Sequence, residues 1–421
     1  MTKTIAINEI IDPSQVRVSV HRDAAGAVLD ARFDLSGLPR VDGVLVGRPV
    51  AEVPRLVERL CGICPVAHHL AGVAALESLW GVGPLSPTVG LVRRLLNHGS
   101  VIATHALGFL DIDRDAVIAL RRFGTLTQSA AGSPKHFPTT AVPGGVLSQI
   151  GSEQAQGVAD AVPGALEAAL GLARGVLDSE CPVEPYGGAD VALVDEDGRV
   201  DLLGSRLRAV AADGTVVVDG ARAEEWDKLV CEAVPGDAAP QLYLTALGAQ
   251  AGGYRTGPVA QLRVGELATP QAAGLQREWL AGPQRADAAR AILMVHCVEA
   301  IDELVHDPLL TSDDIGTPVA ASVAEGVGTG WVDTGRGLLV HRYVGGADGL
   351  MASASILTPT AQNEPWMAAL LRQAASSESG TKLTLAMEDA IREADPCLPC
   401  TSAPIGQMGV VVDTVVDGKE A

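Results

Sequence analysis

The sequence predicts an α+β fold that is mainly α, with a central bundle of long helices and β-hairpins at the periphery. Three observations lead to this prediction. Apolar residues recur at helical spacing in four long stretches, over 53–110, 160–178, 269–307 and 364–394. Short segments of alternating polarity occur near the start and over 185–250. Hydrophobic residues make up 47% of the 421 residues, enough for a sizeable core, so we expect one large domain over 1–421.

The first elements expected are a hairpin and three helices. Val16, Val18 and Val20 alternate with polar residues, residues 23–26 supply a turn, and residues 28–33 form the returning strand. Helical spacing begins after Pro49 and continues to residue 110, with a break at Trp80-Gly81. The stretch 124–152 is rich in Gly, Pro and Ser and predicts an irregular connection.

The second half begins with a helix over 160–178. Residues 185–250 change character, with short alternating segments and Asp-Gly turns, and predict a β-rich insertion. Two helices separated by Gly282-Pro283 follow over 269–307, and strands and turns over 330–360. The last helical stretch, 364–394, leads directly to a pair of cysteines.

The charge balance restricts the classes of partner. With 31 Lys and Arg against 51 Asp and Glu, the net charge of -20 repels nucleic acids and anionic membrane surfaces, so neither is expected as a partner. No stretch approaches the roughly 20 uninterrupted apolar residues that cross a bilayer. The start of the chain lacks a charged segment followed by an apolar one. We therefore expect a cytoplasmic protein without a membrane span.

Four of the seven cysteines form two Cys-x-x-Cys pairs, Cys61/Cys64 and Cys397/Cys400. An odd number of cysteines in a chain without an export signal argues against a disulfide framework. Two pairs provide four thiolates, a complete ligand set for a soft or borderline metal such as zinc, iron, nickel or copper(I). The other three, Cys181, Cys231 and Cys297, stand alone and are interpreted as small apolar residues.

The separation of the pairs distinguishes the kinds of metal site. Zinc ribbons place their pairs about 15 to 20 residues apart, whereas Cys64 and Cys397 are 333 positions apart (397 − 64). The tertiary fold must therefore bring the two ends of the chain together, with the metal site buried between the N- and C-terminal segments. A structural zinc site assembled in this way stays possible. A redox-active pair is less favoured, because no thioredoxin-like βαβ context surrounds either pair.

The motifs around these cysteines resemble those of the large subunit of nickel–iron hydrogenases. The segment 59–68, Arg-Leu-Cys-Gly-Ile-Cys-Pro-Val-Ala-His, resembles the N-terminal signature of the family, and 395–400, Asp-Pro-Cys-Leu-Pro-Cys, the C-terminal one. Between them, matching elements follow in the family order: Gly47-Arg48-Pro49, Gly253-Tyr254-Arg255-Thr256-Gly257-Pro258, Gly335-Arg336-Gly337 and Thr358-Pro359-Thr360 with Asn363. The resemblance covers nearly the whole chain and is greatest for the soluble, bidirectional, cofactor-linked class.

The resemblance implies a nickel bound by all four thiolates. Cys61 and Cys397 would be terminal ligands, and Cys64 and Cys400 would bridge to an iron that carries carbonyl and cyanide. The implied activity is heterolytic cleavage or formation of dihydrogen, with a terminal thiolate such as Cys397 taking the proton. Electrons would pass to an iron–sulfur small subunit, because the chain has no further cysteine cluster. Cofactor-reducing subunits and maturation proteins are the other partners that the resemblance suggests.

Five further residues receive roles from the resemblance. Arg336 matches the arginine over the open metal position, where its guanidinium would orient and polarise a small ligand. His68 would donate to the bridging sulfur, and Thr360 to a cyanide. Asn363 would brace that loop, and Arg59 would add positive potential that favours thiolate. Taken alone, a histidine beside an apolar helix is usually a core residue, and an arginine in a polar loop is equally often without a role at a site.

The sequence also departs from the family pattern. Ala403 stands where the C-terminal motif normally has a histidine, and Val46 where a glutamate normally precedes Gly-Arg-Pro. Both are magnesium-site positions, and an aliphatic side chain cannot bind a hard cation, so no magnesium is expected. Residues 404–421 have the length of the family's removable C-terminal tail. Near the start, Glu9 and Asp12 are the only candidates for the family's proton-relay glutamate, and neither aligns with it.

Two classes of function therefore remain beside a structural zinc protein. The favoured one is a catalytic hydrogenase large subunit in a heteromeric complex. The alternative is a hydrogenase-like hydrogen sensor or electron-transfer scaffold with little turnover, suggested by the missing magnesium ligands and proton relay. The four cysteines together with Arg336 favour the enzyme.

Overall fold

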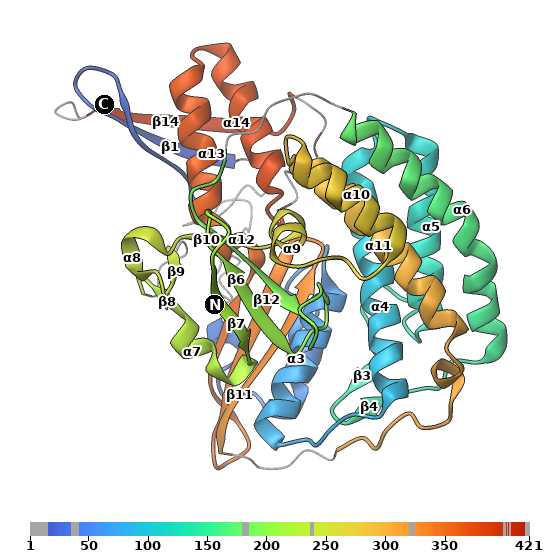
Figure 1. The fold of residues 1–421 in the computed structure, drawn as a ribbon. Coiled ribbons are helices and arrows are strands. Elements are labelled where there is room, and N and C mark those ends of the chain that lie inside the picture. The colour runs from blue at the N-terminus through green and yellow to red at the C-terminus, as the bar shows by residue number, and fades with distance from the viewer. Residues whose placement is uncertain are drawn as a thin grey trace, which may run out of the picture.

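The computed structural model describes residues 16–34, 42–178, 185–235, 240–319, 325–398, 401, 403 and 406–416. Glu9, Asp12, Cys181 and Cys400 lie outside this range. Figure 1 shows a bundle of long helices on one side, strands crossed by α3 in the centre, and α13 and α14 beside a small terminal sheet. The predicted mainly α fold with peripheral hairpins is confirmed.

The two ends of the described chain meet in one sheet. The predicted hairpin is present as β1 (Val16–Arg22) and β2 (Val28–Phe33), which pair antiparallel. On the other edge of β1, β14 (Val410–Val416) pairs in parallel, with Val16 opposite Val410. Helix α13 (Glu364–Ser377) packs against β2. Residues from both ends thus form a three-stranded sheet in the order β14-β1-β2.

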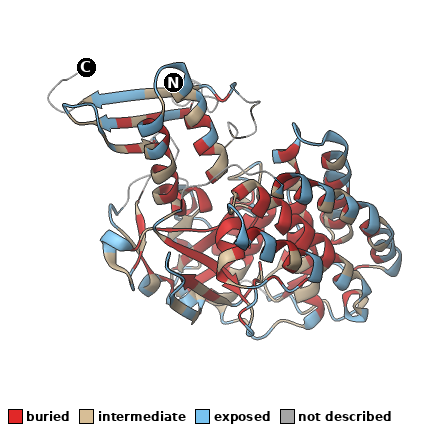
Figure 2. Cartoon of the chain, turned by 45° about the horizontal axis from the view of Figure 1, so that its top comes forward, coloured by how far each residue is buried: buried red, intermediate tan, exposed pale blue. Residues whose placement is uncertain are grey.

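The helix bundle consists of α4 (Pro87–His105), α5 (Arg114–Ala130), α6 (Ser152–Leu177), α10 (Pro270–Ala281) and α11 (Ala286–His306). Helix α11 packs against α4, α6 and α10, and α5 lies between α4 and α6. The two helices predicted around Gly282-Pro283 are confirmed as α10 and α11. Figure 2 shows that buried residues are concentrated in this bundle and in the central strands.

Helix α5 corrects the prediction of an irregular connection over 124–152. The Asp113 carboxylate accepts hydrogen bonds from the amides of Asp115 and Ala116 and so begins the helix. Gly124, interpreted as a loop residue, instead lets α4 and α5 cross closely. A Cβ at Gly124 would lie 2.5 Å from the Gly99 carbonyl oxygen. The irregular connection begins only after Ala130, and α6 begins at Ser152 rather than near 160.

The central sheet contains β11 (Gly326–Thr334), β12 (Gly337–Gly345) and β13 (Met351–Leu357). Helix α3 (Pro65–Trp80) lies on β11 and β12. Its backbone approaches β11 so closely that a Cβ at Gly330 would lie 2.2 Å from the Ala75 amide nitrogen. This contact fixes the start of α3 relative to the β11–β12 turn that carries Arg336.

The region 185–250 contains most of the remaining strands. A four-stranded sheet has the order β10-β5-β6-β7, and a hairpin pairs β8 with β9. Their buried side chains form a cluster with Trp331, Leu338 and Val340 of the central sheet. The bounds are β5 Ala189–Val194, β6 Arg206–Val210, β7 Val216–Ala221, β8 Val230–Glu232, β9 Leu242–Leu244 and β10 Tyr254–Arg255.

The shorter elements complete the chain. They are α1 Asp42–Leu45, α2 Val53–Val57, β3 Ala141–Val142, β4 Gly145–Val146, α7 Trp226–Leu229, α8 Gly248–Ala251, α9 Pro258–Val264, α12 Pro359–Gln362 and α14 Thr381–Ala394, with 3-10 turns η2 Val50–Glu52, η3 Ala106–Phe109, η4 Ala223–Glu225 and η5 Pro308–Thr311. Among the described helices, none combines the length and apolar character needed to span a bilayer.

Candidate metal centre

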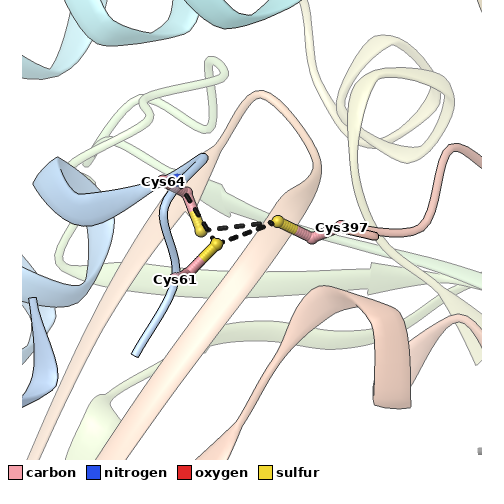
Figure 3. Close-up of side chains that lie close together, drawn as sticks. All are labelled: Cys61, Cys64 and Cys397. Atoms are coloured by element: carbon pink, nitrogen blue, oxygen red, sulfur yellow. Dashed lines mark hydrogen bonds between the residues drawn. The ribbon is translucent and has the colours of Figure 1, made fainter. Parts of the chain in front are cut away.

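Three cysteine sulfurs from opposite ends of the chain meet at one point. The Sγ of Cys397 lies 3.3 Å from that of Cys61 and 3.6 Å from that of Cys64. Figure 3 shows the three sulfurs directed at one another, from the α2–α3 turn and from the segment after α14. Two sulfurs each about 2.3 Å from one tetrahedral ion would lie roughly 3.8 Å apart. The spacing and the soft donors therefore fit a thiophilic metal.

The N-terminal cysteines are fixed by the start of α3. Cys64 is the residue before the helix and Pro65 is its first residue, the position at which a missing N–H costs nothing. The amides of Ile63 and Cys64 each donate to the Cys61 Sγ at 3.4 Å. These donors favour a thiolate at Cys61, as helix starts do for anions in general.

The C-terminal cysteine is fixed by the end of α14. Asp395 adopts the left-handed conformation (φ 45°) that ends the helix, and Pro396 cannot continue it. The amide of Cys397 then donates to the Thr360 Oγ1 at 2.8 Å. Thr360 belongs to α12, so the ligand-bearing turn is attached to the element that follows the central sheet.

The three thiols share negative charge unequally. Hydrogen bonds from Cys397 and Cys64 lower the pKa of Cys61. The hydrogen bond with Cys397, then that with Cys61 and burial, raises the pKa of Cys64, and the hydrogen bond with Cys61 together with burial raises that of Cys397. Without a cation the cluster therefore favours a single thiolate, because like charges at this distance repel. A bound divalent metal would allow all of them to ionise.

Arg336 lies beside the sulfurs at the tip of the β11–β12 hairpin. Its Nη2 donates to the Asp395 carboxylate at 3.2 Å, and its side chain is 10% exposed. Burial opposes its charge, but Asp395, Cys397 and Cys64 raise its pKa, so it stays a cation. Its Nε and Nη1 atoms are buried and have no hydrogen-bond partner within the described part of the chain. A buried guanidinium with two such nitrogens next to thiols is suited to bind and polarise a small ligand.

The other predicted site residues are placed as follows. His68 is buried on α3, one turn after Cys64, with its Nδ1 3.0 Å from the His341 Nε2. Asn363 is buried and makes two hydrogen bonds to the Thr256 backbone, at 2.8 and 3.1 Å. Arg59 is exposed, with its guanidinium 5.7 Å from the centre of the Phe137 ring. The structure thus brings Arg336, Thr360 and three cysteines together and leaves Arg59 at the surface.

Sequence reasoning gave no role to several residues that surround the site. Asp395, quoted only as part of a motif, is the partner of Arg336. His105 lies under the arginine loop, and a Cβ at Gly335 would be 2.7 Å from its Nε2. Gly335 therefore leaves room for the His105 ring. No local sequence signal pointed to His105.

Val46 and Ala403 are the two positions that lack the family's magnesium ligands. Val46 is half exposed, just after α1. Beyond Ala403, the amides of Gly406 and Met408 donate to the buried Glu388 carboxylate at 2.8 and 3.1 Å. Met408 is fully buried, and the chain then enters β14. The described part of segment 404–421 is therefore bonded into the fold.

These features define a class: a metalloprotein whose thiolate centre is assembled from both ends of the chain by the tertiary fold. No family model matches the sequence. A vhu subunit of the F420-non-reducing hydrogenase of Methanocaldococcus jannaschii is 30% identical, over 85% of this chain and 95% of that protein. The NAD-reducing hydrogenase HoxS subunit beta of Cupriavidus necator is 28% identical, over 96% of both chains.

A solved structure agrees with these relatives. An NAD+-reducing [NiFe]-hydrogenase in its H2-reduced state superposes with a TM-score of 0.80 and 27% identity, covering 91% of this chain and 95% of that one. The protein belongs to the nickel–iron hydrogenase large-subunit family. It is a hydrogenase, an oxidoreductase acting on dihydrogen within a multi-subunit complex, and its active site contains nickel and iron.

Proposed function

We propose that this chain carries the dihydrogen-activating centre itself, with nickel and iron bound by Cys61, Cys64, Cys397 and Cys400. The observation that supports this most directly is the meeting of three sulfurs beside the buried, partly unpaired guanidinium of Arg336. A structural zinc site needs thiolates but has no use for a buried cation with free donors beside them. The fourth ligand, Cys400, follows from the family motif.

When bound by these cysteines, nickel and an iron with carbonyl and cyanide ligands would accept the electron pair of dihydrogen. The residues of the chain position the small molecule and take the proton. Arg336 orients the small molecule through its free Nε–H and Nη1–H groups, and Asp395 fixes the plane of the guanidinium. The Sγ of Cys397 takes the proton of the heterolytic step.

Surrounding residues fix the ligands. The Thr360 oxygen accepts the Cys397 amide, which leaves its own proton free to donate to a cyanide on iron. His68 would donate a hydrogen bond to the sulfur of Cys64. Asn363 braces the 254–258 segment, which packs against the arginine loop. Arg59 contacts no ligand in this proposal. Its charge contributes only a long-range positive potential at the thiolates.

In the proposed complex, electrons pass to an iron–sulfur small subunit, and maturation proteins assist assembly. The names of the relatives suggest a cofactor-reducing module, because one is called NAD-reducing. We propose a cytoplasmic location for this assembly. We also propose that no magnesium is bound at the C-terminal motif, since Val46 and Ala403 offer no oxygen side chain.

The test is to purify the complex with its co-encoded subunits, measure nickel, iron and zinc, and record the infrared spectrum. We expect nickel and iron, together with bands of metal-bound carbonyl and cyanide. Zinc without such bands would overturn the proposal. Hydrogen-dependent reduction of an artificial dye then separates a working enzyme from a sensor. Rapid turnover supports the enzyme, and a full metal centre with negligible turnover supports the sensor.

A further inference from the structure

Two buried residues of β12 continue the hydrogen-bonded structure that begins at His68. The His68 Nδ1 is 3.0 Å from the His341 Nε2, and the His341 Nδ1 is 2.6 Å from the Tyr343 hydroxyl. The three side chains are 4%, 0% and 0% exposed. They form a single row that begins one helical turn from Cys64 and ends inside the apolar cluster around Tyr343.

The fold places this row by simple periodicity. His341 and Tyr343 are two residues apart on β12, so both side chains point to the same face of the strand, the face covered by α3. Gly72 of α3 makes room for the phenol, because a Cβ there would lie 3.2 Å from the Tyr343 hydroxyl oxygen. Helical side chains lean toward the helix start, which is the end of α3 that carries Cys64.

The protons in this row can be assigned by counting donors and acceptors. Burial and the neighbouring His68 lower the pKa of His341, so this ring is neutral with one N–H. Burial raises the pKa of Tyr343, so its hydroxyl keeps its proton. The Tyr343 hydroxyl has no hydrogen-bond partner other than His341 among the described residues. A buried O–H without an acceptor is strongly unfavourable, so Tyr343 donates to the His341 Nδ1.

The rest of the assignment follows. With its Nδ1 accepting, His341 carries its proton on Nε2 and donates to the His68 Nδ1. His68, whose Nδ1 accepts this bond, then carries its proton on Nε2. The opposite arrangement would leave the buried Tyr343 proton without an acceptor.

We propose that Tyr343 and His341 are positioning residues that hold His68 in the tautomer with its proton on Nε2, one helical turn from Cys64. The tautomer assignment concerns the chain alone. Its consequence for the metal thiolates rests on the proposed function. In the proposed centre, the fixed Nε2–H would donate to a thiolate and withdraw electron density from its sulfur, and the Tyr343 phenol would determine whether that donor is present.

The tautomer is tested on the full-length chain without metal. Histidine labelled with 15N is observed by NMR, and His68→Gln and His341→Gln assign the two resonances. We expect both rings to be protonated on Nε2 only. A wild-type spectrum with His68 protonated on Nδ1 would overturn the proposal, so the test does not depend on any variant folding.

The role of the phenol is tested with Tyr343→Phe, and Tyr254→Phe is the matched control. Tyr254 is equally buried and its hydroxyl also has one side-chain partner, Gln362, at 3.1 Å. We expect Tyr343→Phe to convert the His341 and His68 signals into mixed tautomers, and Tyr254→Phe to leave them unchanged. Unchanged tautomers in Tyr343→Phe, or an equal effect of the two variants, would contradict the assigned role.

In the purified complex, Tyr343→Phe should move the infrared bands of metal-bound carbonyl to lower frequency, because the thiolate donates more charge when its hydrogen bond is lost. Hydrogen uptake should fall about tenfold, the lower end of the range for partners that orient metal ligands. Unshifted bands would remove the tuning role. If the wild-type complex lacks these bands altogether, the proposed function fails, whereas the NMR result on the tautomer still stands.

Discussion

The N-terminal and C-terminal sides of the metal centre are built by different means. Cys61 and Cys64 lie at the start of α3, a helix whose backbone packs directly on β11 and is buried for most of its length. Cys397 lies beyond the end of α14, in a turn fixed by individual polar contacts with Thr360 and, through Asp395, with Arg336. The first side relies on core packing, and the second on single hydrogen bonds and ion pairs.

This difference indicates where the site is sensitive. On the N-terminal side many packing contacts share the task of positioning, so loss of one surrounding contact is expected to matter little. On the C-terminal side individual polar contacts, such as that of the Cys397 amide with Thr360, carry more of this task. Single polar substitutions around Cys397 should therefore impair metal loading out of proportion to their effect on the stability of the fold.

The largest effect is expected from loss of a ligand. Cys397→Ser replaces a soft sulfur by a hard oxygen, which binds nickel poorly. We expect nickel content and hydrogen uptake to fall at least about 100-fold, beyond the usual effect of residues around metal ligands. Cys297→Ala is the control, because Cys297 is fully buried in α11 without a metal role. Normal nickel in Cys397→Ser would refute the ligand assignment.

Arg336→Lys should separate catalysis from metal loading. A lysine keeps the charge but lacks the planar fork of donors, so we expect hydrogen uptake to fall about 100-fold. Nickel and iron content should be unchanged, since the guanidinium is not a ligand. Arg174→Lys, at an exposed ion pair with Glu278, is the control for the substitution itself. Equal uptake in Arg336→Lys and wild type would remove the proposed role.

Thr360→Val tests the C-terminal side most directly. Valine fills the same space but leaves the buried Cys397 amide without an acceptor, so we expect about tenfold lower nickel content after expression. Thr127→Val makes the same change inside α5, where the hydroxyl donates to the Phe123 carbonyl. That variant should retain full nickel content. A similar nickel loss in both variants would point to general destabilisation rather than to positioning of Cys397.

Acidification should affect the helix bundle that supports the N-terminal side. Burial lowers the pKa of His98 to about 3 and that of His296 to about 4. Because these folded-state values lie below that of a free histidine, the unfolded chain binds more protons as the pH falls from about 6.5 toward 4. Stability should therefore decrease by about 1.4 kcal/mol per pH unit for each residue. Denaturant unfolding at several pH values measures the slope.

His296→Gln supplies the check on this pH dependence, since glutamine does not titrate. The slope between pH 6.5 and 4 should become shallower by one histidine's contribution. An unchanged slope would show that His296 does not provide it.

The smallest effect is expected at the attachment of the terminal strand. Glu388 is buried and accepts the amides of Gly406 and Met408. Glu388→Gln removes the charge and should cost about 1–3 kcal/mol of unfolding free energy, in the range for hydrogen bonds to charged groups. Glu167→Gln on the exposed face of α6 should cost less than about 0.5 kcal/mol. Equal stability of the two variants would show that β14 is attached by strand pairing alone.

Much of the fold could be predicted because its signals are local. The alternation of Val16, Val18 and Val20 predicted β1, and Gly282-Pro283 divided α10 from α11. Helix α5 was missed for a local reason too. Its Gly and Ser residues suggested a loop, whereas the close approach of Gly124 to Gly99 depends on a neighbouring helix that the sequence does not reveal. The pairing of β14 with β1 likewise joins strands nearly 400 positions apart (410 − 16), for which no local pattern exists.

The sequence by itself determined the chemistry of this protein: which cysteines form pairs, that an arginine and a histidine accompany them, and which family has these motifs in this order. Residue types and short spacings can be read directly from the sequence. The tertiary structure decided which atoms meet. It paired Arg336 with Asp395, left Arg59 exposed, and aligned His68, His341 and Tyr343 in one row. Such contacts arise when a helix packs on a sheet, and the relative position of two elements depends on all the side chains between them.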